Sequence, residues 1–161
     1  MNSIHSIPRK LALAIFAFVA LFNTSFGASI SDMNKDALAA MKSGKWAEAQ
    51  AILVKATNSY DARAPQLYGP RFGWFWYHRG YCEIKLGMFG DAMKSFEKCY
   101  KRYPNTKPKE GQAPSKNMYN KLSLLMWGHA AKGAEEWATS IRMYKKFLEE
   151  RDPARDRYEK G

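Results

Sequence analysis

The sequence predicts an all-α protein in which about three helical hairpins stack into a short solenoid. Three observations support this fold class. Apolar residues recur at helical spacing over residues 72–104, a glycine-containing turn divides that stretch into two helices, and the segments on either side repeat it more loosely. Neither helix of such a pair can bury its apolar stripe alone, so the short connection must fold the two against each other.

The central hairpin is predicted from Phe72 to Pro104, with its turn at residues 87–90. Pro104 cannot continue a helix and disfavours helical geometry at Tyr103, so the second helix is expected to stop there. Each helix carries an apolar stripe. The stripe residues are Trp74, Tyr77, Tyr81 and Ile84 in the first helix, and Phe89, Ala92, Met93, Phe96, Cys99 and Tyr100 in the second.

This hairpin resembles a tetratricopeptide repeat, an antiparallel helix pair of about 34 residues. Seven residues agree in kind and in spacing: Trp76, Gly80, Gly87, Phe89, Ala92, Phe96 and Pro104. Gly80 and Ala92 are expected to let the two helix backbones approach closely. The resemblance implies a right-handed solenoid of tetratricopeptide-like hairpins, in which the first helix of each hairpin lines a concave groove.

Two residues of the central hairpin depart from the family pattern. Arg79 stands where leucine is usual, and Glu83 stands where tyrosine is usual. They lie four residues apart on one helical face, so they could form an ion pair. The two substitutions leave open which face of the first helix is buried.

A first repeat is predicted over residues 31–60. Ser31 and Asp32 are expected to cap a helix over residues 33–43, and a second helix should cover residues 46–56. The spacing of the central hairpin recurs at Gly44, Trp46, Ala49, Leu53 and Ala56. The distance between the two repeats exceeds the standard period by about nine residues. This excess is assigned to a loop over residues 57–71, which contains Pro65, Gly69 and Pro70.

A third repeat is predicted over residues 116–153. Its apolar residues are Tyr119, Leu122, Leu125, Met126 and Trp127, followed by Trp137, Ile141, Tyr144, Phe147 and Leu148. The turn over residues 132–136 looks longer than usual, and residues 105–115 should form an exposed loop. No polar capping helix follows Pro153, which indicates either an open end or a fragment of a longer array.

Residues 1–27 have the pattern of a secretory signal peptide. Arg9 and Lys10 precede an apolar run over residues 11–22, and Ser25 and Gly27 supply the small residues that a signal peptidase reads. The alternatives are an uncleaved anchor and a buried core helix, although a membrane-spanning helix needs about 20 apolar residues. Cleavage after Gly27 predicts an exported chain, in the periplasm or outside the cell, with residues 28–161 as the repeat domain.

Positive charge dominates the composition. The chain has 26 basic and 15 acidic residues, and Lys94, Lys98, Lys101 and Arg102 form a basic face on one predicted helix. This excess suggests anionic partners such as lipid headgroups, cell-wall polymers or acidic proteins, or it serves solubility alone. Nucleic acid is not expected as a partner, because the predicted signal peptide directs the chain out of the cytoplasm.

The sequence gives no support for catalysis, a cofactor or a metal. The chain after Gly27 has two histidines, His78 and His129, at no metal-binding spacing, and it has no glycine-rich phosphate loop or nucleophile motif. Cys82 and Cys99 would be offset by roughly 8 Å along an antiparallel hairpin. A disulfide wants Cα atoms within about 7 Å, so two buried thiols are favoured over a bridge.

Binding is the function that the resemblance implies. The groove-lining residues would be Trp74, Tyr77, Tyr81 and Lys85 in the central repeat, Leu38, Met41 and Lys42 in the first, and His129 and Lys132 in the third. Aromatic side chains beside lysines suit a peptide with apolar anchors and acidic groups. The alternative is that this aromatic stripe is core, with the helix rotated so that Arg79 and Glu83 reach water.

The sequence therefore predicts an exported scaffold or assembly factor of the cell envelope, which holds a partner peptide in its concave groove. Two alternatives remain. The chain could bind anionic lipid or cell-wall polymer through its charge, or it could be the docking domain of a longer envelope protein.

Overall fold

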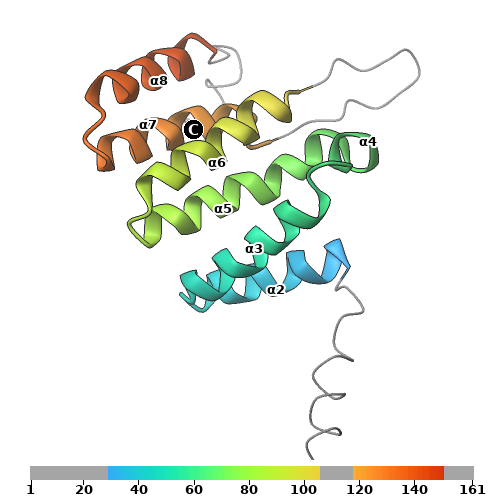
Figure 1. Cartoon of the computed structure of the whole chain (residues 1–161). Coiled ribbons are helices and arrows are strands. Elements are labelled where there is room, and N and C mark those ends of the chain that lie inside the picture. The colour runs from blue at the N-terminus through green and yellow to red at the C-terminus, as the bar shows by residue number, and fades with distance from the viewer. Residues whose placement is uncertain (1–28, 106–117, 151–161) are drawn as a thin grey trace, which may run out of the picture.

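The computed structural model describes residues 29–105 and 118–150 as a stack of helices (Figure 1). The predicted signal peptide, most of the predicted loop before the third repeat and the last residues of that repeat lie outside the described residues. Three hairpins are formed by α2 (Ile30–Lys42) with α3 (Trp46–Tyr60), α5 (Gly73–Lys85) with α6 (Phe89–Arg102), and α7 (Asn120–Gly133) with α8 (Trp137–Glu149). Each of these helices packs on the next in chain order, so the predicted all-α solenoid is confirmed.

The three hairpins close with the same turn. Gly44, Gly87 and Glu135 all have positive φ, at 70°, 74° and 61°. The next residue in each turn donates its N–H to a carbonyl near the end of the first helix, in the pairs Lys45–Ala40, Met88–Glu83 and Glu136–Ala131. These are Schellman-type helix ends, which usually place glycine at the left-handed position. The third turn is therefore no longer than the others, contrary to the prediction, because α7 continues through Gly133.

Aligning the three turns shows one repeated contact inside each hairpin. A Cβ atom on Gly80 would lie 2.8 Å from the Phe96 ring, and one on Gly128 would lie 2.4 Å from the Tyr144 ring. The equivalent pair in the first hairpin is Ala37 and Leu53, both fully buried. Gly80 was predicted to bring two backbones together. Its actual role is to leave room for an aromatic ring of the partner helix.

The first hairpin starts earlier and ends later than the sequence predicted. The cap of α2 is Ser29, not Ser31 and Asp32, and its hydroxyl accepts the N–H of Asp32 at 3.2 Å. The helix α3 continues past Ala56 to Tyr60. The predicted loop over residues 57–71 is instead mostly helical, since α4 (Ala64–Leu67) and the 3-10 helix η1 (Gly69–Phe72) follow.

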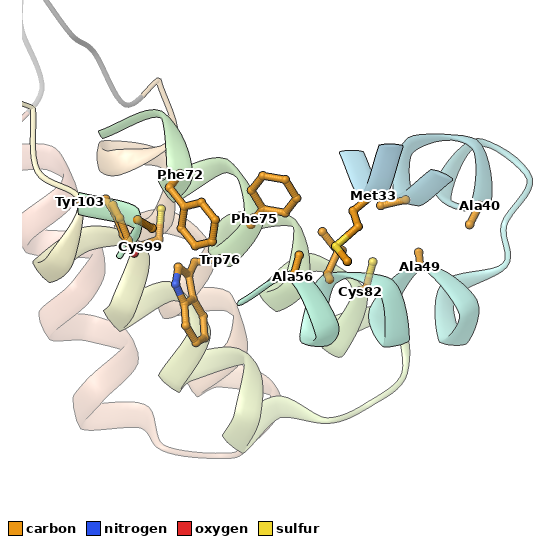
Figure 2. Close-up of a cluster of buried hydrophobic side chains, with 13 residues drawn as sticks. Met33, Ala40, Ala49, Ala56, Phe72, Phe75, Trp76, Cys82, Cys99 and Tyr103 are labelled. Carbon is orange, nitrogen blue, oxygen red and sulfur yellow. The ribbon is translucent and has the colours of Figure 1, made fainter. Parts of the chain in front are cut away.

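The main core lies where the first hairpin meets α5 and the end of α6 (Figure 2). Asp61, directly after α3, ties these elements together. Its Oδ1 accepts hydrogen bonds from Trp76 Nε1 at 2.8 Å and from Tyr103 Oη at 2.6 Å. Burial, together with this bond to Asp61, raises the pKa of Tyr103 above its ordinary value. A carboxylate in a predicted loop is thus the link between three helices.

The end of α6 and the two cysteines agree with the sequence predictions. The helix stops at Arg102, and Tyr103 has left helical geometry before Pro104, with φ −121° and ψ 56°. Cys82 and Cys99 are buried as separate thiols. Burial raises the pKa of the Cys82 thiol to about 11, so this sulfur is an apolar core group at neutral pH.

Replacing Glu135 by glycine should stabilise the protein. A residue with a Cβ atom is strained at positive φ, and the equivalent positions in the other two turns are both glycine, Gly44 and Gly87. We expect Glu135→Gly to raise the free energy of unfolding by about 0.5–1 kcal/mol in urea denaturation. The neighbouring Glu136→Gly is the control, because Glu136 has φ −82° and gains nothing from glycine. Equal effects of the two substitutions would contradict this account of the turn.

Replacing Gly80 by alanine should destabilise the central hairpin. The new Cβ atom would overlap the fully buried Phe96 ring, and overpacking of this kind costs about 1–3 kcal/mol. Gly90→Ala is the matched control, since a Cβ atom there has nothing within 4 Å and alanine favours the helix. Thermal unfolding followed by circular dichroism should show opposite shifts of Tm for the two variants. A neutral Gly80→Ala would mean that Phe96 can move aside.

Candidate peptide-binding groove

A groove of about 300 Å³ lies between the first two hairpins. Its walls are Met41 and Lys42 at the end of α2, Trp46 at the start of α3, and Tyr77, His78 and Tyr81 on α5. The turn at Gly44 brings α2 and α3 together at one end, while the face of α5 supplies the aromatic side. The groove is therefore apolar on its walls and carries a lysine at its rim.

Ring contacts fix the shape of the aromatic side. Trp46 meets Tyr81 edge to face, with ring centroids 5.9 Å apart, and Tyr77 lies 4.6 Å from Tyr119, just before α7. The Lys85 ammonium sits 5.4 Å from the centroid of Tyr81 and 5.7 Å from that of Trp46. Such cation–π contacts hold a charged group against an aromatic surface without burying it. The lysine thus marks one end of the groove with positive charge.

His78 is held in one orientation on the groove wall. Its Nδ1 donates to the carbonyl of Trp74 at 2.9 Å, and its ring stacks on Trp74 with centroids 4.2 Å apart. Burial lowers the pKa of His78, so the imidazole is neutral at pH 7. With Nδ1 protonated, Nε2 remains as a hydrogen-bond acceptor. Burial also raises the pKa of Tyr77 to about 12, which leaves its hydroxyl protonated.

The predicted partner-binding residues do not all gather at this groove. Tyr77 and Tyr81 line it, Trp74 supports His78, and Lys85 lies on Tyr81. His129 and Lys132 are exposed on α7 and do not line it, and His129 instead pairs with the Tyr144 hydroxyl at 3.1 Å. Among the residues expected from the first repeat, Met41 and Lys42 line the groove and Leu38 does not.

The sequence analysis missed two groove residues, Trp46 and His78. The sequence pattern identified Trp46 only as a residue of the repeat spacing. Its place at the groove follows from the packing of α3 on α5. His78 had no distinctive spacing. Asn34 is a further polar group of interest, since it occupies the α2 position equivalent to Tyr77. Its amide oxygen is buried and has no hydrogen-bond partner among the described residues.

A buried ion pair sets the rotation of α5. Arg79 Nε lies 2.9 Å from Glu83 Oε1, which confirms the predicted pair, and the Glu83 side chain is wholly buried. The other carboxylate oxygen accepts the Ser95 hydroxyl of α6 at 2.6 Å, while Arg79 Nη1 donates to Thr57 of α3 at 2.9 Å. The alternative in which Arg79 and Glu83 both rotate into water is therefore wrong.

This rotation decides which side of α5 is core. Phe75, Trp76, Gly80 and Glu83 are buried, whereas the predicted stripe of Trp74, Tyr77, Tyr81 and Ile84 is partly exposed. The physical reason is that α5 is covered on two sides, by α3 and α6. The predicted stripe lies on the third side. Its aromatic residues are thus available to a ligand as well as to their neighbours.

The predicted basic surface on α6 is largely neutralised. Lys94 pairs with Asp91 at 3.0 Å, Lys101 with Glu97 at 2.6 Å, and Arg102 with Asp61 at 3.4 Å. Lys98 lies 6.0 Å from the centroid of the Trp76 ring. Three of the four cations therefore already face carboxylates. This face offers less free positive charge than the sequence suggested.

Metal and membrane features are not found in the part of the chain described. No group of three or more histidine, cysteine or acidic residues there could hold a metal ion. No helix among residues 29–105 and 118–150 has the length and apolarity needed to cross a membrane.

Residues 75–106 match the family model of the tetratricopeptide repeat. The matched residues contain most of α5 and all of α6, the hairpin with the Gly80–Phe96 contact. The central hairpin of this chain is therefore similar to a tetratricopeptide repeat in sequence as well as in fold. No curated protein matches it significantly. Repeats of this family characteristically serve as scaffolds for protein–protein interaction, through the extended concave surface of the stack.

Breaking the buried ion pair should strongly destabilise the central hairpin. Glu83→Ala leaves the Arg79 guanidinium without its partner, which costs about 3–5 kcal/mol for a buried pair. Asp91→Ala is the control, because its pair with Lys94 is exposed and worth at most about 1 kcal/mol. Urea unfolding monitored by tryptophan fluorescence measures both. Adding Arg79→Leu to Glu83→Ala should recover part of the loss, and equal losses for the two single variants would contradict the network.

Proposed function

We propose that this protein is an exported scaffold or assembly factor of the cell envelope, which holds a partner protein by an extended peptide in the groove between α2, α3 and α5. The observation that carries the proposal is the partly exposed aromatic pair of Tyr77 and Tyr81, which lines the groove beside Lys42 and Lys85. Aromatic side chains with few rotatable bonds bind at low entropic cost, and they are enriched at interaction hot spots. The role is non-catalytic.

The chemistry of the groove indicates the kind of peptide. An apolar side chain of the ligand would pack on the rings of Tyr77 and Tyr81, and a carboxylate of the ligand would approach Lys42 or Lys85. The ligand is therefore an extended segment with an apolar anchor next to an acidic residue.

Charge-driven binding to lipid or cell-wall polymer is the weaker proposal. The basic face of α6 is paired with Asp91, Glu97 and Asp61, so few of its cations are free to meet an anionic surface. Export is proposed from residues 1–27 alone, on the pattern of a charged start, an apolar run and a small-residue cleavage site.

Peptide selection tests the groove directly. A random peptide library displayed on phage is panned on residues 28–161, a segment that contains every helix of the described fold, and selected peptides are measured by calorimetry. We expect them to combine an aromatic or aliphatic residue with an acidic one. Tyr81→Ala should weaken binding at least tenfold, which corresponds to about 1.4 kcal/mol. Lys85→Ala should reduce the preference for acidic residues.

The control variant is Leu67→Ala, since Leu67 is 62% exposed on α4 and lies outside the groove. It should bind as the parent does. Affinity should largely survive 0.5 M salt, where screening acts over only a few Å (about 3 Å at 1 M). Peptides that bind Tyr81→Ala as tightly as the parent, or that are lost entirely in salt, would reject the groove in favour of the basic surface.

A further inference from the structure

The outer face of α8 exposes three large apolar side chains. Trp137, Ile141 and Leu148 are 58%, 56% and 59% exposed. Aligning the hairpin turns shows that the equivalent residues on α6 are Phe89, Met93 and Tyr100. These three are only partly exposed, because α7 packs over Phe89 and Met93, and Lys146 and Glu150 contact Tyr100. The face of α8 is thus the surface that a following helix covers one repeat earlier in the stack (Figure 1).

The outer face of α2 is the complementary half of the same contact. Asp32, Asp36 and Ala39 are exposed on α2, whereas their equivalents on α5 are Phe75, Arg79 and Cys82, which face α3 and are buried or partly buried. Ala39 matches Ala130 on α7, which packs in the cluster with Met93 of α6. A small residue therefore stands on α2 where the internal contact requires one. The two ends of the described stack carry the two halves of one repeated interface.

Charges of opposite sign are available at the two ends, although Lys35 is also exposed on α2 and Glu149 on α8. Arg142 and Lys145 are exposed beside the apolar residues of α8, and Asp32 and Asp36 are exposed on α2. A hydrogen bond from the Ser29 hydroxyl lowers the pKa of Asp32, so this group stays ionised well below neutral pH. The α2 residue equivalent to Lys85 is Lys42. Since Lys85 lies over the Trp46 ring within the chain, Lys42 of a second molecule could lie over Trp137 in the same way.

We propose that α8 of one molecule stacks on α2 of a second copy of this chain, in the geometry of the internal contacts of α3 with α5 and of α6 with α7. The contact is heterologous, because each molecule contributes a different face. It therefore propagates head to tail, as an open chain or a ring, and does not stop at a two-fold dimer. Much of the interface is polar, so the association belongs to the weak, transient class. The proposal does not depend on the groove.

Sedimentation velocity of residues 28–161 tests this contact. From about 10 µM to 1 mM, the range for weak interfaces, the mass-average size should rise through dimer to longer species. Ile141→Asp, which puts a charge on the α8 face, should remain monomeric. Asp36→Lys, which reverses the charge on the α2 face, should also remain monomeric. The control is Lys55→Asp, a charge reversal at an exposed position of α3, which should associate as the parent does.

Mixing the two monomeric variants gives the decisive result. Ile141→Asp keeps an intact α2 face and Asp36→Lys keeps an intact α8 face, so an equimolar mixture should form a dimer and stop there. Circular dichroism confirms that each variant is folded, and Trp137→Ser replaces Ile141→Asp if the latter is not. A parent protein that stays monomeric at every concentration would overturn the proposal. The α8 face would then be a candidate contact for a helix of a different protein. Association of Asp36→Lys with itself would overturn it too, because α8 would then pair with α8.

Discussion

The stack depends on a size-matched contact between the two helices of every hairpin. A small residue on the first helix receives a large residue from the second, as Ala37 with Leu53, Gly80 with Phe96, and Gly128 with Tyr144. Where the small residue is glycine, the large residue is aromatic, and where the small residue is alanine, the large residue is leucine. This compensation lets three different sequences form similar hairpins, and the shared left-handed turn then joins their helices in the same way. Because each hairpin presents a similar outer surface, the next one can stack on it.

The aromatic wall of the candidate groove is a consequence of how α5 is held. Phe96 fills the space at Gly80, and the Arg79–Glu83 pair reaches Thr57 on α3 and Ser95 on α6, so the helix is fixed from two sides. Burying these charges costs desolvation energy, which is offset only while every partner is in place. The buried pair fixes the rotation of α5 about its own axis. Because Glu83 points inward, Tyr77 and Tyr81 lie on the side of the helix that α3 and α6 do not cover. Their position at the groove thus follows from a pair of residues that does not itself line the groove.

Much of this fold could be predicted from the sequence, and the errors have specific physical causes. Gly87, Phe96 and Pro104 identified the central hairpin because the turn, the core contact and the helix stop each require a particular residue type. The buried side of α5 could not be predicted from periodicity, because a helix covered on two sides has two apolar stripes. Either the stripe that begins at Trp74 or the one that begins at Trp76 could have been the buried one. The linking role of Asp61 gave no local signal, because its partners Trp76 and Tyr103 lie far along the chain. Trp46 was seen as a repeat position, and its place at the groove depended on packing between hairpins.

The groove is not repeated along the solenoid, although the hairpins are. The positions equivalent to Tyr77 are Asn34 and Leu125, and those equivalent to Tyr81 are Leu38 and His129. A scaffold with identical repeats would let a peptide slide by one hairpin, since every register would offer the same contacts. Among the described residues the aromatic pair occurs in one hairpin only, whereas the lysine recurs in the first hairpin as Lys42. Under the proposed function, a peptide with one apolar anchor and one acidic group would have a single favourable register on this surface, and a scaffold needs such a register in order to hold one partner in a defined position.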